Sequence, residues 1–478
     1  MASQHISVRL KVGANFLSTW LVRLHLVSNP TELFRLEWFV SLRVFVNGLI
    51  FAHCNYKDGV VAAGRRRFMY DPTMHARSLA RHFLPGDFIA DPTLLEEPDR
   101  RAVVDQAVQI GANGFATVTF LESTLRGKTI HQVTDIAQLL VLRHVSKNIR
   151  RLTGVKQENR QFIIECIRTM LREGTSYRVY KFDIKSFYES ANIDQILERL
   201  RNDEGFSGQS AVALDTFFTF AKAAGVSGLP RGIGLSAILA EYLLRPFDQH
   251  IAEMSHVWFY ARFVDDIFIV TSGREDGGTF VRHATASLPD GLLFNRKSEI
   301  YDFEKFSKNQ TGLAHAIDFL GYRFNVSRPL RSSEKGVMRT VTLDIAPAKV
   351  RKLKTRIVKS LLRFSTDANY DDLRARFRLI TGNFNFVDRA TNIRRVSGIY
   401  FNYPLVDLES STAIPDLDKF LRNMVMSPHP GNKLRPVLAT ALRRELARLT
   451  FRDGHAKKRF YSFRPERLVE LTSVWQHA

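Results

Sequence analysis

The stretch Tyr260-Ala-Arg-Phe-Val-Asp-Asp-Ile-Phe-Ile-Val270 sets two adjacent aspartates between two short runs of aromatic and β-branched residues. Such runs favour strands, so the stretch predicts a strand, a tight turn and a second strand, with Asp265 and Asp266 at the bend. Two carboxylates this close repel each other in a partly dry site unless a divalent cation neutralises them, and oxygen ligands favour magnesium or manganese. A solvated acidic turn is the alternative interpretation of the pair taken alone.

Composition points to a polyanionic partner. The chain has 478 residues, enough for two or three domains, and 45% of them are hydrophobic, which supports a substantial core. The net charge is +21 at pH 7, and the isoelectric point is near 10.1. Residues 331–478 hold 29 Lys/Arg against 14 Asp/Glu, a difference of +15. Nucleic acid is the first candidate partner, and the C-terminal third is the expected contact region.

Cysteine and hydropathy patterns predict a cytoplasmic protein with no membrane partner. Cys54 and Cys166 are far apart and lack CxxC or Cys/His spacing, so neither a disulfide framework nor a zinc site is expected. The most apolar stretch, 39–52, is interrupted by Arg43 and Asn47 and is too short to span a membrane. No signal-peptide pattern precedes it.

The hydrophobic pattern predicts a chain of mixed helix and strand. Residues 1–95 alternate strand-like runs, such as 5–12, with mixed segments, and are expected to form an N-terminal extension without visible chemistry. The other elements expected are strands at 116–121, 177–183 and around Leu293 and Phe319, and helices at 135–145 (opened by Thr134), 160–172, after Ile193, after Gly234 and after the glycine-rich break 273–278. From about 345 onward, mainly basic amphipathic helix is predicted, as in 350–362.

Asp183 ends the predicted strand 177–183 and lies 82 residues before Asp265. The helices expected between them can return the chain to the same sheet, which would bring three carboxylates together. On central neighbouring strands of an antiparallel sheet, such carboxylates bind two divalent ions about 4 Å apart, a clamp for in-line displacement at phosphorus. One ion lowers the pKa of an attacking hydroxyl, and the other holds a triphosphate and its leaving group.

Five short motifs follow one another in the order seen in reverse transcriptases. They are Phe182-Asp-Ile-Lys-Ser-Phe-Tyr-Glu-Ser190, Gly228-Leu-Pro-Arg-Gly232, Phe263-Val-Asp-Asp266, Leu293-Phe-Asn-Arg-Lys297 and Phe319-Leu-Gly-Tyr-Arg-Phe324. Each is weak alone, but the series is specific. The chain therefore resembles the reverse transcriptases, and among them the bacterial retron and antiphage-defence type with its abortive-infection relatives. The resemblance covers about 115–330 by motif, and 331–478 only as a thumb.

The resemblance implies an α+β, right-hand polymerase fold with a magnesium-dependent centre, manganese being the alternative ion. After the extension 1–95, fingers would cover 96–180, a palm with an antiparallel sheet 181–330, and a basic helical thumb 331–478. The metal-holding positions correspond to Asp183, Ile184 and Asp265, with Asp266 as a supporting carboxylate. Lys297 matches the family's lysine that protonates or neutralises the departing pyrophosphate. A solvated surface lysine is the alternative interpretation of Lys297.

Two further positions match the family's nucleotide site. Tyr188 lies five residues after Asp183, where the family places an aromatic steric gate that clashes with a 2′-hydroxyl and favours deoxynucleotides. Arg126 and Lys128 stand where fingers residues grip an incoming triphosphate. A solvated basic turn explains Arg126 and Lys128 equally well.

The loop 228–234 matches the family's template and nucleotide loop, and it assigns Pro230, Arg231 and Gly232 to nucleotide binding. Its glycines would let the backbone approach a base pair closely. The alternative interpretation is a turn that only initiates a helix, and this holds whether or not the loop binds a nucleotide. The loop is neither a phosphate loop nor a dinucleotide fingerprint, because it lacks Gly-Lys-Ser/Thr and contains a proline.

Two segments are expected to hold the nucleic acid. Phe319, Leu320 and Gly321 resemble the primer grip, although an apolar strand with a glycine bend gives the same pattern. The basic helix carries five cations without an acid, which favours backbone contact over a solvated charged face. These cations are Arg351, Lys352, Lys354, Arg356 and Lys359.

The chain departs from the family at two places. Phe263 replaces the common tyrosine before the aspartates, which keeps the ring and hardly affects metal binding. Arg231 stands where many relatives have glutamine, and after Gly232 the chain continues with Ile-Gly-Leu-Ser instead of a Pro- and Thr-containing stretch, which puts ordinary template handling in doubt. No RNase H or endonuclease signature is visible.

The expected function is RNA-directed DNA synthesis from dNTPs in bacterial antiphage defence, with an RNA template or non-coding RNA as partner and DNA as product. A partner protein or a homo-oligomer stays open. One alternative is a template-independent or protein-primed DNA polymerase of the same fold. An alternative of another class is a non-catalytic RNA-binding scaffold, which the three carboxylates disfavour because a pure binding module gains nothing from burying them.

Overall fold

The computed structural model describes residues 71–125, 127–203, 205–296, 298–307, 311–332, 336–388, 393–429, 431 and 435–475, and the backbone of two short strands. These strands, β1 (Phe45–Val46) and β2 (Leu49–Ile50), pair antiparallel. The chain divides into two compact units, Met1–Met69 and Tyr70–Ala478. The strand predicted at 5–12 lies outside the described residues. The second unit mixes helices with antiparallel sheets.

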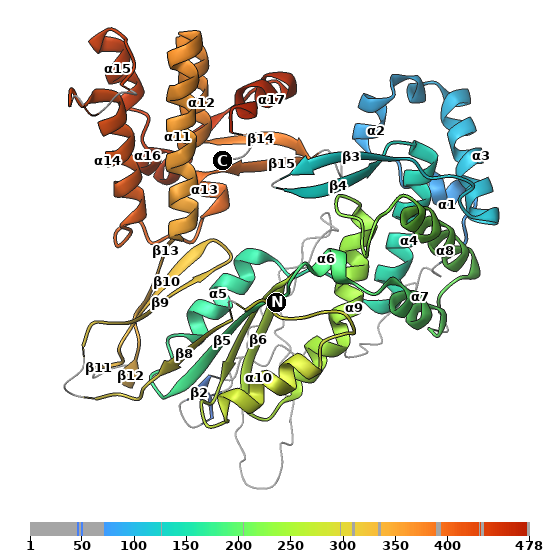
Figure 1. Ribbon diagram of the computed structural model, residues 1–478, viewed down its shortest axis with the longest axis horizontal. Helices are drawn as coiled ribbons and strands as arrows, with labels where there is room; N and C mark the ends of the chain where they lie inside the picture. Colours follow the sequence, from blue (N-terminus) through green and yellow to red (C-terminus); the bar gives the residue numbers. More distant parts are fainter. Residues whose placement is uncertain are drawn as a thin grey trace, which may run out of the picture. The chain divides into compact units, whose positions relative to one another are not determined.

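A four-stranded sheet forms the centre of the second unit, in the order β6-β7-β5-β8 (Figure 1). Its strands are β5 (Tyr177–Asp183), β6 (Val257–Phe263), β7 (Asp266–Thr271) and β8 (Glu299–Phe303), all antiparallel. The prediction of strand 177–183 and of the hairpin around the two aspartates is confirmed. The strand expected around Leu293 was wrong: only an isolated bridge from Ile184 to Phe294 forms there, and β8 begins at Glu299.

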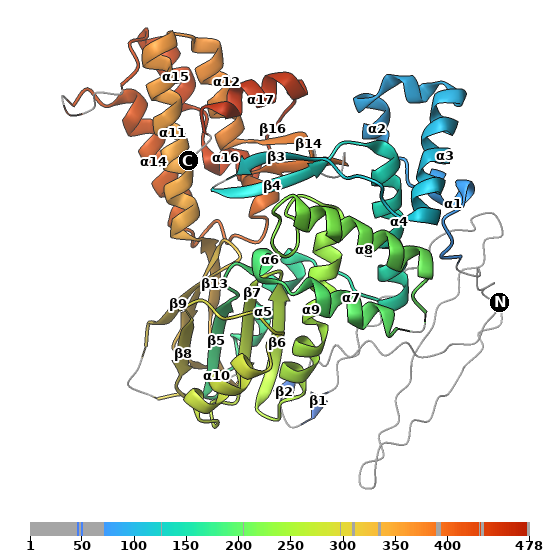
Figure 2. The same ribbon diagram turned by 45° about the vertical axis from the view of Figure 1, so that its right-hand side comes forward.

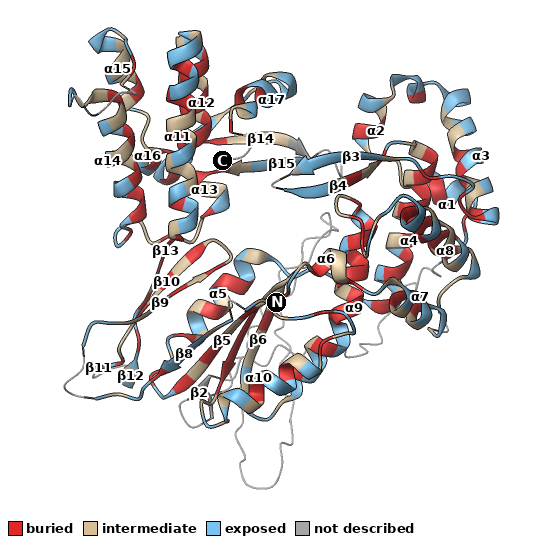
Figure 3. Ribbon diagram, viewed as in Figure 1, coloured by how far each residue is buried: buried red, intermediate tan, exposed pale blue. Residues whose placement is uncertain are grey.

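The two faces of this sheet are buried by different elements, and the central strands are accordingly buried (Figure 3). Tyr180 and Phe182 belong to one core cluster with the helices α9 (Gly234–Glu253) and α10 (Gly277–Ala286). Tyr177 and Val179 belong to a second cluster with α5 (Arg160–Met170) and the strands that follow the sheet. Burial on both faces explains why β7 carries a continuous apolar run without the polar alternation of a half-exposed strand.

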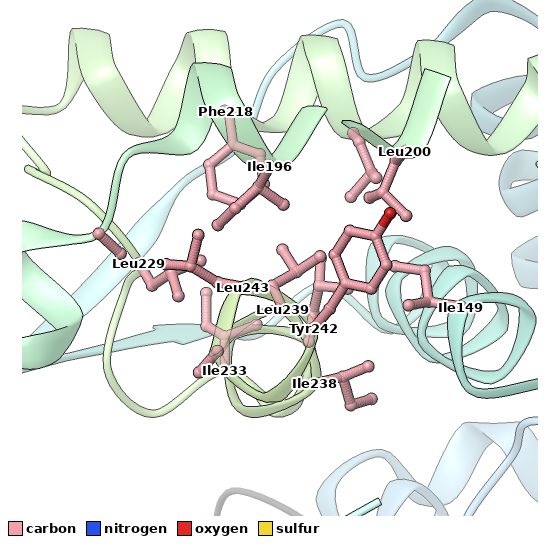
Figure 4. Packing of buried hydrophobic residues seen from close by; sticks show 14 of the residues in the cluster. Ile149, Ile196, Leu200, Phe218, Leu229, Ile233, Ile238, Leu239, Tyr242 and Leu243 are labelled. Atoms are coloured by element: carbon pink, nitrogen blue, oxygen red, sulfur yellow. The ribbon is translucent and has the colours of Figure 1, made fainter. Parts of the chain in front are cut away.

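Helices dominate the part of the second unit that precedes and surrounds α9. Figure 4 shows Leu239, Tyr242 and Leu243 of α9 packed against Ile196 of α7 and Ile149 of α4. These helices and their neighbours are α1 (Ala76–Ala80), α2 (Pro85–Ala90), the 3-10 turn η1 (Pro92–Leu95), α3 (Glu97–Asn113), α4 (Ile136–Thr153), α6 (Phe187–Ser190), α7 (Ile193–Arg201) and α8 (Gly208–Ala223). Thus α1 to η1, within the predicted extension 1–95, fold with the second unit.

The hairpin β3 (Phe120–Leu125) and β4 (Lys128–Val133) precedes α4. The strand predicted at 116–121 therefore begins later than expected. Helix α4 begins with Asp135 as its cap, whose carboxylate accepts from the amide of Gln138 at 2.9 Å, so the prediction that Thr134 opens it was wrong. Both residue types cap helices well, and only the backbone conformation decides between them.

The C-terminal part combines helices with three small sheets (Figure 2). Strands β9 (Leu313–Phe319), β10 (Tyr322–Ser327) and β13 (Val341–Ile345) form one, β11 (Leu330–Ser332) and β12 (Gly336–Met338) a second, and β14 (Asn383–Asp388), β15 (Ile393–Gly398) and β16 (Phe460–Tyr461) a third. The helices are α11 (Pro347–Asp367), α12 (Tyr370–Thr381), α13 (Ile399–Asn402), α14 (Ala413–Met426), α15 (Thr440–Ala447), α16 (Phe451–Ala456) and α17 (Pro465–Ser473).

The basic helix predicted within 350–362 is confirmed as part of α11, whereas the third sheet was not expected. Across the described residues, none of the helices combines the length and the apolar character that crossing a bilayer requires.

Candidate active site

Strand pairing brings the three predicted carboxylates to one end of the central sheet. Asp183 lies opposite Asp266 in the β5–β7 ladder, so their side chains share a face. Asp265 occupies the two-residue turn between Phe263 and Asp266, and its carbonyl accepts from the amide of Ile184 at 3.1 Å. The convergence predicted from the spacing is therefore present in the backbone.

The three carboxylates do not form a ready-made metal-binding group. Within the part of the chain that the structure describes, no three His, Cys, Asp or Glu groups are placed to hold a metal ion as they stand. One carboxylate oxygen of Asp183 instead accepts from the side-chain amide (Nδ2) of Asn295 at 3.1 Å. The backbone amide of Asn295 also donates to the backbone carbonyl of Asp183, at 2.7 Å. The donor set is all oxygen, which fits magnesium or manganese.

The electrostatics of the pair also fit a cation. Burial, and then the charges of Asp265 and Asp183, raise the pKa of Asp266 to about 6. Burial likewise raises the pKa of Asp265, with the Asp183 carboxylate adding to it. Each carboxylate thus resists ionising beside its neighbours, and a divalent cation would relieve that cost.

A buried arginine fixes the turn that carries Asp265. Val264 has φ 60°, a left-handed conformation that is costly for a β-branched residue. Arg262 donates from Nη1 to the Val264 carbonyl at 3.0 Å. Its other nitrogens bind both oxygens of Asp248 at 2.8 and 2.7 Å and one oxygen of Glu241 at 2.6 Å. The Arg262 side chain is only 5% exposed, so α9, which supplies both acids, is tied directly to the turn.

Sequence reasoning missed this network, although a signal existed. An arginine inside an apolar strand needs a buried acid, and Glu241 and Asp248 are spaced seven apart on one helix, which places them on the same face.

Tyr188 lies in a charged cluster that joins three segments. Arg231 donates from Nε and Nη2 to the two oxygens of Glu189 at 2.8 and 3.1 Å, and its guanidinium lies 4.8 Å from the centre of the Tyr188 ring. Lys128 of β4 lies 3.4 Å from the same carboxylate. Hydrogen bonds from Arg231 lower the pKa of Glu189 to about 2. The structure therefore brings together Tyr188, Lys128 and Arg231, which were each assigned to the nucleotide site, around Glu189, an acid that the prediction omitted.

Two glycines of the loop, Gly228 and Gly232, leave no room for a side chain. A Cβ on Gly228, which has φ 65°, would lie 2.2 Å from the carbonyl oxygen of Tyr188. A Cβ on Gly232, at φ 96°, would lie 2.6 Å from Ile130. The Arg231 carbonyl accepts from the amide of His131 at 2.7 Å, which pairs the loop with β4. Pro230, which lies between these two glycines, is buried. These close approaches are to α6 and β4, and the expected approach to a base pair stays a prediction.

The predicted primer grip is the turn between β9 and β10. Phe319 is buried, and Leu320 and Gly321 have φ 46° and 83°. Arg160 donates from Nε to the Leu320 carbonyl at 3.0 Å and from Nη1 to the Asn402 carbonyl at 2.9 Å. An arginine outside the hairpin thus holds this turn as well.

Both turns open onto one cleft of about 670 Å³. Val264, Asp265 and Asp266 line it from one hairpin, and Phe319, Leu320 and Gly321 from the other. Its cationic side chains come from β5, α5 and α11. They are Arg160, Lys181, Lys349, Lys352 and Arg356.

The five cations predicted on α11 do not share one role. Lys352 and Arg356 line the cleft together with Lys349, which the prediction omitted. Lys354 instead pairs with Asp416 at 2.7 Å. Arg351 is exposed, and Lys359 lines a second cavity of about 600 Å³. A helix turns 100° per residue, so neighbouring positions cannot all face the same side.

Arg126 and Lys297, which the prediction placed at the nucleotide, lie outside the described residues.

Comparisons with known proteins add little to this geometry. No family model matches the chain, and no curated protein matches it in sequence. Among solved structures, the chain is similar to an apo telomerase from Candida tropicalis truncated from the C-terminal domain, with a TM-score of 0.31 and 15% identity. The match covers 44% of this chain and 53% of the telomerase chain, so the chain spans about half the length of that structure. At this TM-score the likeness does not assign a fold.

Proposed function

We propose that the chain is a magnesium-dependent reverse transcriptase, an enzyme that extends a DNA strand from dNTPs on an RNA template. One observation carries the proposal: the β5–β7 register sets Asp183 opposite Asp266, with Asp265 at the adjacent turn. The cationic cleft in front of Asp265 and Asp266 suits a nucleic-acid backbone. In this proposal 96–180, 181–330 and 331–478 serve as fingers, palm and thumb.

The residues divide the work as follows. Asp183, Ile184 and Asp265 would hold magnesium or manganese, and Asp266 would support them. When bound, the ions supply activation of the attacking hydroxyl and neutralisation of the triphosphate. Lys128 and Arg231 bind the phosphates, and Tyr188 selects the sugar. Lys297 neutralises the leaving pyrophosphate. The cleft cations Lys349, Lys352 and Arg356 hold the backbone of the template and product.

The biological setting rests on the motif resemblance. We propose a bacterial antiphage role with a non-coding RNA as partner, in the cytoplasm.

The test is dNTP incorporation with Mg²⁺ on an RNA template and DNA primer, comparing the native protein with Asp265→Asn and Asp266→Asn. The expected result is a loss of at least a hundredfold for each variant. Asp318→Asn is the matched control, because Asp318 lines the same cleft but pairs with Arg323 at 2.7 Å. Retained incorporation in both turn variants would refute the proposal.

A template-independent polymerase is the second candidate, and the state of Arg231 favours it. Arg231 donates to Glu189 and its guanidinium lies over the Tyr188 ring, so in this arrangement its donors are engaged within the protein and not with a template-paired nucleotide. Sequencing the product decides between the two, since a homopolymer or simple repeat unrelated to the supplied RNA excludes ordinary copying.

A further inference from the structure

The small sheet β15-β14-β16 presents a row of aromatic side chains on one face. Directly opposed residues in an antiparallel pair share a face, and the register pairs Phe384 with Ser397 and Phe386 with Arg395. The parallel pairing of β14 with β16 sets Tyr461 beside Phe384. These five residues are called the aromatic face below. All three rings are partly exposed: Phe384 and Phe386 each pack one side against the second core cluster, and the Arg378 guanidinium lies 5.5 Å from the centre of the Tyr461 ring.

The aromatic face continues the wall of the cleft. Phe384 and Ser397, at its base, line the same cleft as Asp265 and Asp266. Phe386 and Arg395 lie one step further along the hairpin, away from this base. The opposite face of β15 carries Val396, a residue that is 51% exposed. A strand leaving the cleft along the hairpin would therefore meet the aromatic face.

The chemistry of the aromatic face fits unpaired bases. Side chains two residues apart on a strand are separated by roughly 7 Å, about two steps of a nucleotide strand. Rings at this spacing can stack with bases irrespective of sequence. Arg395 is the register partner of Phe386 and is exposed, so it adds a positive charge to the same face. The surrounding region 331–478 has an excess of 15 positive charges, which matches a polyanion.

We propose that the aromatic face binds a single-stranded segment of the nucleic acid that occupies the cleft. This inference rests on the proposed function for what lies in the cleft, but the binding itself does not require catalysis. A duplex keeps its bases stacked on one another, so rings on the aromatic face have little to bind in it.

The test is fluorescence anisotropy of the full chain with a labelled 20-nucleotide single-stranded DNA, the corresponding RNA and a duplex. Phe386→Leu keeps most of the apolar volume but removes the stacking ring. It should weaken single-strand binding about fivefold to a hundredfold and leave duplex binding nearly unchanged. Arg395→Gln should lower the slope of log affinity against log salt by about one. The DNA and RNA arms identify which strand the face prefers.

Val396→Ala is the matched control, because it alters the neighbouring residue on the opposite face. Native-like thermal unfolding of each variant confirms that the fold persists. Single-strand affinity of Phe386→Leu within twofold of the native protein would overturn the inference, as would an equal loss in Val396→Ala. The two proposals fail separately. If Asp265→Asn abolishes incorporation while Phe386→Leu binds normally, only the aromatic face is refuted. If Phe386→Leu weakens binding but the native protein incorporates no dNTP, only the polymerase is refuted.

Discussion

Replacing Arg262 by methionine removes the one cation that the structure places between Glu241 and Asp248 and also the donor to the Val264 carbonyl. Breaking a buried pair by removing one partner costs about 3–5 kcal/mol, because the remaining charge is left uncompensated. The Glu241 and Asp248 side chains are 14% and 27% exposed, so water offsets part of this cost. We expect the free energy of unfolding to fall by about 3 kcal/mol at pH 7.5, measured by urea denaturation.

The loss should depend on pH in a defined direction. Burial raises the pKa of Glu241 and the charge of Arg262 opposes that rise, so without Arg262 this pKa is higher still and the folded protein binds more protons than the unfolded chain. Stability of Arg262→Met relative to the native protein should therefore recover as the pH falls towards 5.

Two further variants complete this experiment. Arg262→Lys should lose less, because an ammonium keeps the charge but cannot serve two carboxylates and a carbonyl together. Arg323→Met is the matched control: Arg323 binds Asp318 through two nitrogens but on the surface, where such pairs contribute less than about 1 kcal/mol. Equal losses in Arg262→Met and Arg323→Met, or a loss below about 1 kcal/mol in both, would refute the assignment of Arg262 as the anchor of the turn.

Three other outcomes follow from the charges. Burial raises the pKa of Asp266 from its ordinary 3.8 to about 6, so the protein loses stability as the pH rises through this range. At pH 8 in EDTA, Asp266→Asn should therefore raise the free energy of unfolding by up to about 3 kcal/mol. A lower free energy of unfolding in denaturant would contradict this. Burial, and then the charge of His144, lower the pKa of His82 from 6.5 to about 4. Between pH 6.5 and 4 the unfolded chain therefore binds more protons than the folded protein. The melting temperature should fall on acidification through this range, and less steeply in His82→Gln. Glu189→Gln should lower the KM for dNTP about fivefold by freeing Lys128 and Arg231 for the triphosphate, and an unchanged KM with normal turnover rules out that role.

The central sheet was predictable because its signals are local. The strand 177–183 and the Asp265 hairpin are short apolar runs that end at polar turn residues, and the structure confirms both. Asp183 lies at the end of one strand and Asp266 at the start of another, and placing both strands in one sheet brings the two carboxylates together. What surrounds these acids was not predictable in the same way, since Arg262 binds Glu241 and Asp248, which lie 21 and 14 positions earlier in the sequence on a different element.

The β14–β15 hairpin shows a different limit. Asn383-Phe-Asn-Phe386 alternates polar and apolar residues, the period of a strand, but only four residues carry the signal. The flanking segments are basic and helical, and they dominated the prediction for 331–478. On α11 the prediction claimed too much. The composition suggested that five cations contact the nucleic acid, but of these five only Lys352 and Arg356 lie on the side of the helix that lines the cleft.

The two turns that line the cleft are built on the same physical principle. Val264 and Leu320 both adopt positive φ without being glycine, which costs of order 1–3 kcal/mol at each position. Such conformations persist only where the surroundings over-determine them, and here each carbonyl is held by an arginine, Arg262 and Arg160 respectively. Arg262 ties its turn to α9, and Arg160, from α5, ties the other to Asn402 beside the third sheet. The position of each turn is therefore set by a separate structural layer, so a movement of α9 or α5 would alter the spacing between the aspartates and the predicted primer grip.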